Sequence, residues 1–201
     1  MIAGPSEIVV VAEPVVSPEW VAADLLSQAE HDTRAQAILI TDERAFAGRV
    51  AEAVAGQLAS LERGAIAGAS WEAHGAIIVV PGLEGVDRLV DALAPEHLEL
   101  IGPRAEGLAA TIRHAGAIFT GAFTPEVIGD YVGGPNHVLP TSRTARFASG
   151  LAVHDFLKRT TLLSCDAASF RALGPAAATL ARAEGLEAHA LAVLRRLGGL
   201  G

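Results

Sequence analysis

The chain has 201 residues, 51% of them hydrophobic, and a formal net charge of -8 at pH 7. This length suits one substantial domain, or one domain with a small appendage. No segment gathers lysines and arginines, so the negative charge argues against nucleic acid or an anionic membrane as partner and favours small metabolites. The apolar run near the amino terminus is cut by Glu13 and Pro14, which predicts neither a signal peptide nor a transmembrane helix.

The sequence contains one cysteine, Cys165, which therefore has no partner for an internal disulfide. A reducing, cytoplasmic compartment is expected on that basis. Because Cys165 follows Leu162 and Leu163 closely, a buried and inert thiol is the default expectation.

Short β-branched runs alternate with longer helical patterns through the first half of the chain. The expected strands are Ile8–Val11, Ala37–Thr41, Ala76–Val80, Leu98–Ile101 and Ala117–Phe119. The expected helices are Pro18–His31, Glu43–Leu61, Leu83–Leu93 and about Ala105–His114. Strand–helix alternation indicates an α/β fold with a parallel sheet and crossover helices. Strands that are apolar throughout indicate helices on both faces, so a doubly wound sheet is predicted.

The pattern changes after the last expected strand. Residues Gly129–Ser149 are rich in Gly, Pro, Asn, Ser and Thr with little periodicity, which predicts a long functional loop. The chain then turns helical, with expected helices at Leu151–Arg159, Ala167–Ala183 and Leu186–Leu197. We therefore expect an α/β domain over residues 1–150 and a small C-terminal helical segment over residues 151–201.

One helix ends with two potential ligands. Ser17 suits an N-cap and Pro18 the first helical position, and Gln28 and His31 follow three residues apart near the other end. Side chains at i and i+3 share a helical face, so both can point at one ion or substrate. The alternative is that His31 only complements the helix dipole with its charge.

Glu96 and His97 stand side by side, after Pro95 and before an expected strand. The pair suits acid/base chemistry, whereas the alternative is a solvated glutamate and a capping histidine. Ligands of open parallel sheets gather beyond the carboxyl ends of the strands, so residues there are the first to inspect.

Further polar residues could bind a ligand, but each also has a purely structural explanation. Asp130 and the run Gly133–His137 lie in the expected loop, where small residues allow close backbone approach to a ligand, although a simple turn would look the same. Glu184 and His189 flank the start of the last helix, where His189 alone would more often be a surface residue. Ser6 precedes the first strand, in what could be an ordinary tight turn.

Six blocks of this sequence, in order and spacing, resemble the histidinol dehydrogenase family. The blocks are Ile2–Glu7, Asp24–His31, Ala94–Glu99, Gly129–Tyr131, Pro135–Thr141 and Glu184–His189. The resemblance runs over essentially the whole chain but corresponds to about the C-terminal half of the family's polypeptide. It implies that the α/β domain is part of a larger sheet, which leaves an unpaired strand edge here.

The resemblance also implies roles for individual residues. The implied zinc ligands are Gln28, His31, Asp130 and His189. The implied substrate-binding residues are Ser6, Gln28, His31, His97, Asp130, Glu184 and His189. The implied catalytic acid/base residues are Glu96 and His97. Two imidazole nitrogens and two oxygens form a ligand set that suits zinc and leaves room for donors from a substrate.

The family's reaction is the oxidation of L-histidinol through an aldehyde-level intermediate to L-histidine with NAD. Family members resemble homodimers whose C-terminal helices reach into the partner's active site, which would make L-histidinol and a second copy the partners. The residues that bind NAD in the family lie in its N-terminal half, and no Gly-rich dinucleotide fingerprint follows a strand here. The alternative is an N-terminally truncated zinc-binding fragment or assembly module without activity of its own.

Overall fold

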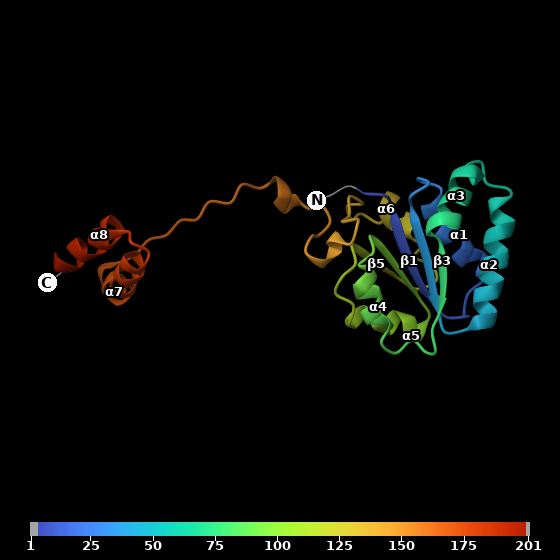
Figure 1. Ribbon diagram of the computed structural model, residues 1–201, viewed down its shortest axis with the longest axis horizontal. Coiled ribbons are helices and arrows are strands. Elements are labelled where there is room, and N and C mark those ends of the chain that lie inside the picture. Colours follow the sequence, from blue (N-terminus) through green and yellow to red (C-terminus); the bar gives the residue numbers. More distant parts are fainter. Residues whose placement is uncertain (1–3, 200–201) are drawn as a thin grey trace. The chain divides into compact units, whose positions relative to one another are not determined.

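The computed structural model describes residues 4–199, and the chain divides into two compact units, Met1–Phe156 and Leu157–Gly201. The first unit holds a five-stranded sheet of order β3-β2-β1-β4-β5, in which every pairing is parallel (Figure 1). The strands are β1 (Glu7–Ala12), β2 (Gln36–Thr41), β3 (Ala76–Val79), β4 (His97–Ile101) and β5 (Ala117–Thr120). The predicted parallel α/β sheet is confirmed.

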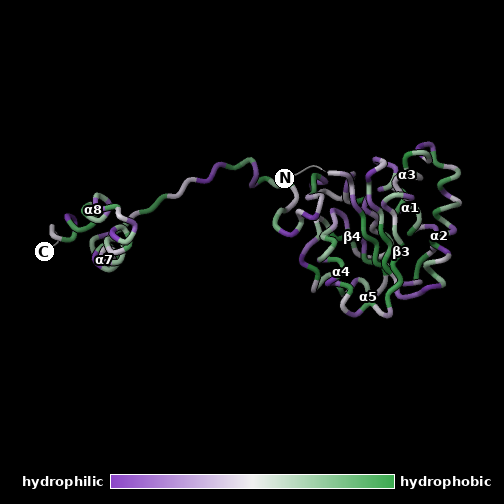
Figure 2. The backbone as a smooth tube through the Cα atoms, viewed as in Figure 1, coloured by the Kyte–Doolittle hydropathy of each residue, from purple (hydrophilic) through white to green (hydrophobic). Residues whose placement is uncertain are grey.

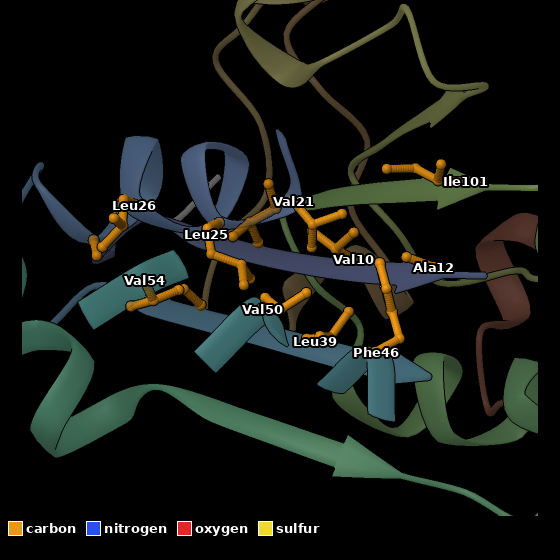
Figure 3. Packing of buried hydrophobic residues seen from close by; sticks show 14 of the residues in the cluster. Val10, Ala12, Val21, Leu25, Leu26, Leu39, Phe46, Val50, Val54 and Ile101 are labelled. Carbon is orange, nitrogen blue, oxygen red and sulfur yellow. The ribbon is translucent and has the colours of Figure 1, made fainter. Parts of the chain in front are cut away.

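Helices cover both faces of the sheet, as the apolar strands require. The helices of this unit are α1 (Pro18–Ala29), α2 (Arg44–Leu58), α3 (Gly64–His74), α4 (Val86–Leu93), α5 (Pro103–Gly107) and α6 (Glu126–Tyr131). Alternate residues of β1 point to opposite faces, so Val10 packs with α1, α2 and α3, whereas Val9 packs with α4 and α5. Figure 3 shows the first of these clusters, with Leu25 and Phe46 beside Val10, and the strands form the green centre of Figure 2.

The central position of β1 decides where the sheet can be extended. Its residues pair with both β2 and β4, so the two edges are β3 and β5. Ile118 on β5 is 38% exposed. Whether strands outside this chain complete the sheet remains a prediction.

Several helix boundaries differ from the sequence expectation. The expected helix Glu43–Leu61 ends at Leu58, and the separate helix α3 was missed because its small residues form no clear apolar stripe. The helix expected at about Ala105–His114 is instead α5 followed by a 3-10 turn over Leu108–Ala110. Part of the expected loop is helical, because α6 includes Asp130.

The second unit contains an antiparallel pair of helices, α7 (Ala167–Ala183) and α8 (Glu187–Gly198), joined by a turn in which Gly185 has a φ of 74°. The helix expected at Leu151–Arg159 is wrong: only a 3-10 turn over Val153–Phe156 forms, because so short a segment needs packing partners to stay helical. Residues 157–166 are extended and exposed, so Cys165 is exposed rather than buried. Leu200 and Gly201 of the expected frayed tail lie outside the described residues.

Candidate active site

The candidate residues of the first unit lie together at the amino ends of the strands. The general rule for parallel sheets places ligands at the carboxyl ends instead. His97 begins β4 and pairs with Ile8 near the start of β1. Helix α1 follows β1 and runs back along the sheet. Its last turn, which contains Gln28, therefore lies near the amino ends of the strands. The end of helix α1, rather than the end of a strand, therefore positions the candidate ligand Gln28.

Glu96 and His97 are both buried, so the alternative of a solvated glutamate is wrong for this pair. The Nδ1 atom of His97 lies 3.1 Å from the carbonyl oxygen of Glu7. A carbonyl only accepts hydrogen bonds, so Nδ1 carries the proton and Nε2 is the basic nitrogen. The backbone N–H of Glu7 donates to Glu96 Oε2 at 3.1 Å, so one residue of β1 orients both side chains.

The basic nitrogen of His97 faces Asp130, with 3.6 Å between Nε2 and Oδ1. Within the described residues, this Nε2 is buried without a hydrogen-bond partner. The ligand-type atoms of His97, Glu126 and Asp130 all lie within 4.8 Å of one another, a spacing that fits a metal ion. Of these three residues, only Asp130 is a zinc ligand that the family resemblance implies. The sequence predicted no role for Glu126.

Gln28 adjoins this group through Glu126. Its Nε2 donates a hydrogen bond to Glu126 Oε2, and its Oε1 is buried without a partner in the part of the chain that the structure describes. The helix α1 ends at Ala29 and not at His31 as expected, so His31 lies two residues beyond it in a turn, where its N–H donates to the Gln28 carbonyl at 3.2 Å.

Further carboxyl groups adjoin Gln28 and were missed from the sequence. Glu99 on β4 accepts the backbone N–H of Glu126 at 2.8 Å, and its Oε2 is buried without a hydrogen-bond partner within residues 4–199. The half-buried Asp24 on α1 is close enough to raise the pKa of Glu99. The available signal was the placement of Glu99 inside a strand with both faces covered, where an acidic side chain needs partners.

Burial is the main cause of the unusual protonation of this group. It raises the pKa of Glu96 to about 7, that of Asp24 to about 6 and that of Glu126 to about 8, with neighbouring carboxylates adding to the rise for Glu96 and Glu126. Burial also raises the pKa of Glu99 and lowers the pKa of His97. Each of these shifts disfavours the charged form.

The residues present fit a divalent cation. A positive ion would offset the repulsion among Glu96, Glu126 and Asp130 and would satisfy the buried Oε1 of Gln28. Nitrogen, amide-oxygen and carboxylate donors of this kind are ones that zinc accepts.

Two cavities open beside these residues. One of about 380 Å³ is lined by Ser6 and His31, with Gly4, Pro5, Asp32 and Arg34. The other, of about 270 Å³, is lined by Asp130 together with residues of β5, α6 and the following loop. His31 is exposed, so its imidazole is open to solvent and to a ligand.

Glu184 and His189 belong to the second unit and are both exposed. Glu184 is the residue after α7, and His189 lies in the first turn of α8. Both line one cavity of about 640 Å³ between these two helices. Their roles remain predictions.

Ion pairs lie at the carboxyl ends of three of the strands. Arg104 Nε contacts Glu13 Oε1 at 2.6 Å, and its Nη1 contacts Asp42 Oδ2 at 2.6 Å. These contacts join the segments that follow β1, β2 and β4, where an open α/β sheet would usually bind its ligand. Across residues 4–199, no helix has the length and apolarity needed to cross a bilayer.

The fold and site together define an α/β protein with a buried glutamate–histidine pair beside a set of residues that fits a metal. The family model described as histidinol dehydrogenase matches residues 1–197, and the chain belongs to this family. It is 64% identical over 198 residues to the histidinol dehydrogenase of Rhodospirillum rubrum, covering 98% of this chain and 46% of that relative. The Cereibacter sphaeroides relative is 62% identical, with 98% and 45% covered.

A solved structure gives the same result. The crystal structure of histidinol dehydrogenase from Elizabethkingia anophelis matches with a TM-score of 0.92 and 39% sequence identity, covering 100% of this chain and 46% of that chain. This chain therefore spans about half the length of the relatives it matches.

Proposed function

We propose that this chain forms the zinc- and substrate-binding part of a histidinol dehydrogenase, which oxidises L-histidinol to L-histidine through the aldehyde level with NAD. The observation that carries the proposal is the buried pair Glu96 and His97, in which the basic Nε2 faces Asp130 at 3.6 Å. Such a pair, beside donors that suit a metal, fits oxidation of an alcohol that loses a proton as it loses hydride.

Zinc would be held by Gln28, His31 and Asp130, with His189 completing the set. When bound, the ion supplies a positive charge that orients the substrate's oxygen and nitrogen atoms. The unpartnered, buried Oε1 of Gln28 supports this assignment.

Proton transfer is the task of the acid/base pair. His97 Nε2 accepts the proton of the substrate hydroxyl, because its other nitrogen is already committed to the Glu7 carbonyl. At the aldehyde stage, Glu96 and His97 together accept a proton from the water that adds to the carbonyl carbon. A pKa of about 7 for Glu96 places that carboxyl where a general base works best.

The hydride acceptor is NAD, and residues 4–199 offer no Gly-rich turn for a dinucleotide. By the family resemblance, the residues that bind it lie in the half of the polypeptide that this chain does not match. Ser6 and Glu184 would contact the substrate. Cys165 as a single thiol supports a reducing, cytoplasmic setting.

The dimeric site of the family predicts that His189 serves the neighbouring subunit. Mixing a His31→Ala chain with a His189→Ala chain should then restore zinc to a share of the sites in the heterodimer. Each variant alone should lack it. Unchanged zinc content in His31→Ala, or no recovery in the mixture, would contradict the shared site.

The second candidate, a zinc-binding fragment or assembly module, is supported by the 46% coverage of the relatives. Supplying the N-terminal half of the Rhodospirillum rubrum relative with this chain separates the two. NADH formation from histidinol in that mixture supports the enzyme, and its absence despite zinc and histidinol binding supports the module. If this chain alone reduces NAD as fast as a full-length relative, the proposed location of the NAD site is wrong.

The acid/base roles are tested in the active mixture. Glu96→Gln and His97→Asn should each slow NADH formation by about 10²- to 10⁴-fold, while histidinol affinity by calorimetry changes far less. Glu106→Gln, an exposed change on α5, is the matched control. Wild-type rates in either site variant would overturn the assignment.

A further inference from the structure

We propose that Glu126 is the positioning residue for Gln28: its carboxylate holds the amide nitrogen, so that the amide oxygen is the atom presented to the metal. The inference rests on the proposed zinc role of Gln28. It concerns a residue that carries no role in the resemblance, and it follows from the contact between Gln28 Nε2 and Glu126 Oε2.

An amide side chain has two ends of nearly equal size, and only one of them can bind a cation. Gln28 is 1% exposed, so hydrogen bonds to bulk water do not determine the orientation of its amide. A carboxylate accepts hydrogen bonds and therefore selects the NH₂ end. The oxygen is left buried without a partner within residues 4–199, which costs about 1–3 kcal/mol unless a cation or donor satisfies it.

Glu126 is itself fixed in place. It is the first residue of α6, it is 3% exposed, and its backbone N–H donates to Glu99 Oε1 on β4 at 2.8 Å. Strand β4 thus fixes the start of α6, and the Glu126 side chain in turn fixes the Gln28 amide at the end of α1. Oε2 of Glu126 is engaged by the amide, so we assign Glu126 to positioning Gln28, and a double-mutant cycle tests this against direct ligation by Oε1.

The first experiment observes the amide directly, without metal and at about pH 9, above the raised pKa of Glu126 of about 8, so that Glu126 is a carboxylate. The chain has three glutamines and one asparagine, so a ¹⁵N-labelled sample gives few side-chain amide signals, and Gln28→Ala identifies the one of interest. We expect one Gln28 proton to be shifted downfield and protected from solvent exchange, unlike the amide protons of the exposed Asn136, which serve as the control. Glu126→Leu should abolish both features. A free Gln28 amide in the wild-type chain would overturn the proposal.

The second experiment measures zinc affinity of the full chain by competition with a chelator. Glu126→Leu should weaken binding by about 10- to 100-fold, the usual effect of losing a residue that orients a ligand. Glu126→Gln keeps an acceptor oxygen for the same amide and should stay within about threefold of wild type. Glu52→Leu, an exposed change on α2, controls for the added leucine, and circular dichroism checks folding.

A double-mutant cycle separates positioning from direct ligation. If Glu126 acts through Gln28, then Gln28→Ala combined with Glu126→Leu binds zinc no more weakly than Gln28→Ala alone. Additive losses, or Glu126→Gln as weak as Glu126→Leu, would overturn the positioning role while leaving the proposed zinc site intact. A wild-type chain that takes up no zinc would overturn the proposed site itself and this inference with it.

Discussion

The carbonyl oxygen of Glu7 lies 3.1 Å from Nδ1 of His97, and this single contact decides which nitrogen of the buried imidazole is basic. The two residues start neighbouring strands of the sheet, β1 and β4. The tautomer is therefore set by strand pairing, which the hydrophobic cores on both faces maintain.

The first prediction concerns that tautomer. In metal-free protein near neutral pH, long-range ¹H–¹⁵N spectra should show His97 protonated at Nδ1 and unprotonated at Nε2, because the Glu7 carbonyl accepts the proton. The exposed His74 should show fast exchange between tautomers and serves as the control. A signal for protonated Nε2 on neutral His97 would contradict the geometry.

The second prediction is a fall in stability with rising pH in metal-free protein. The raised pKa values of Glu96, about 7, and Glu126, about 8, mean that the folded chain holds protons that the unfolded chain has released. Their stabilising effect is complete below the unfolded pKa and is lost as pH rises through the folded values. From about pH 7 to about pH 8.5, these two groups should lower the free energy of unfolding by roughly 1.5 kcal/mol, and Glu99, whose pKa burial also raises, should add to the fall.

Urea denaturation at several pH values, with a chelator present, measures this fall. The window avoids the opposing effect of His97, whose lowered pKa makes stability rise with pH only where unfolded histidines are protonated. Glu126→Gln should reduce the fall by about 1 kcal/mol, the share of this carboxyl. Constant stability across the window in wild-type protein would show that these carboxyls are already ionised.

The third prediction concerns Gly102, which has a φ of 108° and a ψ of 154°, a conformation essentially confined to glycine. A Cβ there would lie 2.5 Å from Glu13 Oε2 and would break the contacts that join Glu13 to Arg104. Gly102→Ala should lower the free energy of unfolding by about 3 kcal/mol. Gly48→Ala, inside α2 with nothing within 4 Å of the new Cβ, should instead raise it by about 0.5–1 kcal/mol.

The fourth prediction compares two valines. Val10 in β1 is 0% exposed and Val15 in the following turn is 61% exposed. Val10→Ala should cost about 2 kcal/mol because it leaves a cavity between the sheet and α1, whereas Val15→Ala should stay within about 0.5 kcal/mol of wild type. Equal losses in chemical denaturation would contradict the core as described.

Periodicity in the sequence predicted the strands and most helices well, because apolar strands and amphipathic helices follow local patterns. Helix α3 was missed since its glycines, alanines and serine leave no stripe to detect. Local propensity predicts a helix at Leu151–Arg159, where only the 3-10 turn Val153–Phe156 forms, because propensity carries no information about missing packing partners.

The site was less predictable from local patterns. The motifs containing Gln28 and His97 were visible, but their contacts with Glu126 and with the main chain of Glu7 join residues far apart in sequence. The rule on carboxyl strand ends did not predict that the candidate residues gather at the amino ends of the strands, whereas at the carboxyl ends Arg104 contacts Glu13 and Asp42.

The central place of β1 also has a consequence for synthesis of the chain on the ribosome. β1 leaves the ribosome well before its partner β4, because His97 at the start of β4 follows Glu7 by 90 residues. Until then, one side of β1 offers unpaired backbone groups to other strands. We infer that nascent chains halted before β4 are the ones that most need a chaperone.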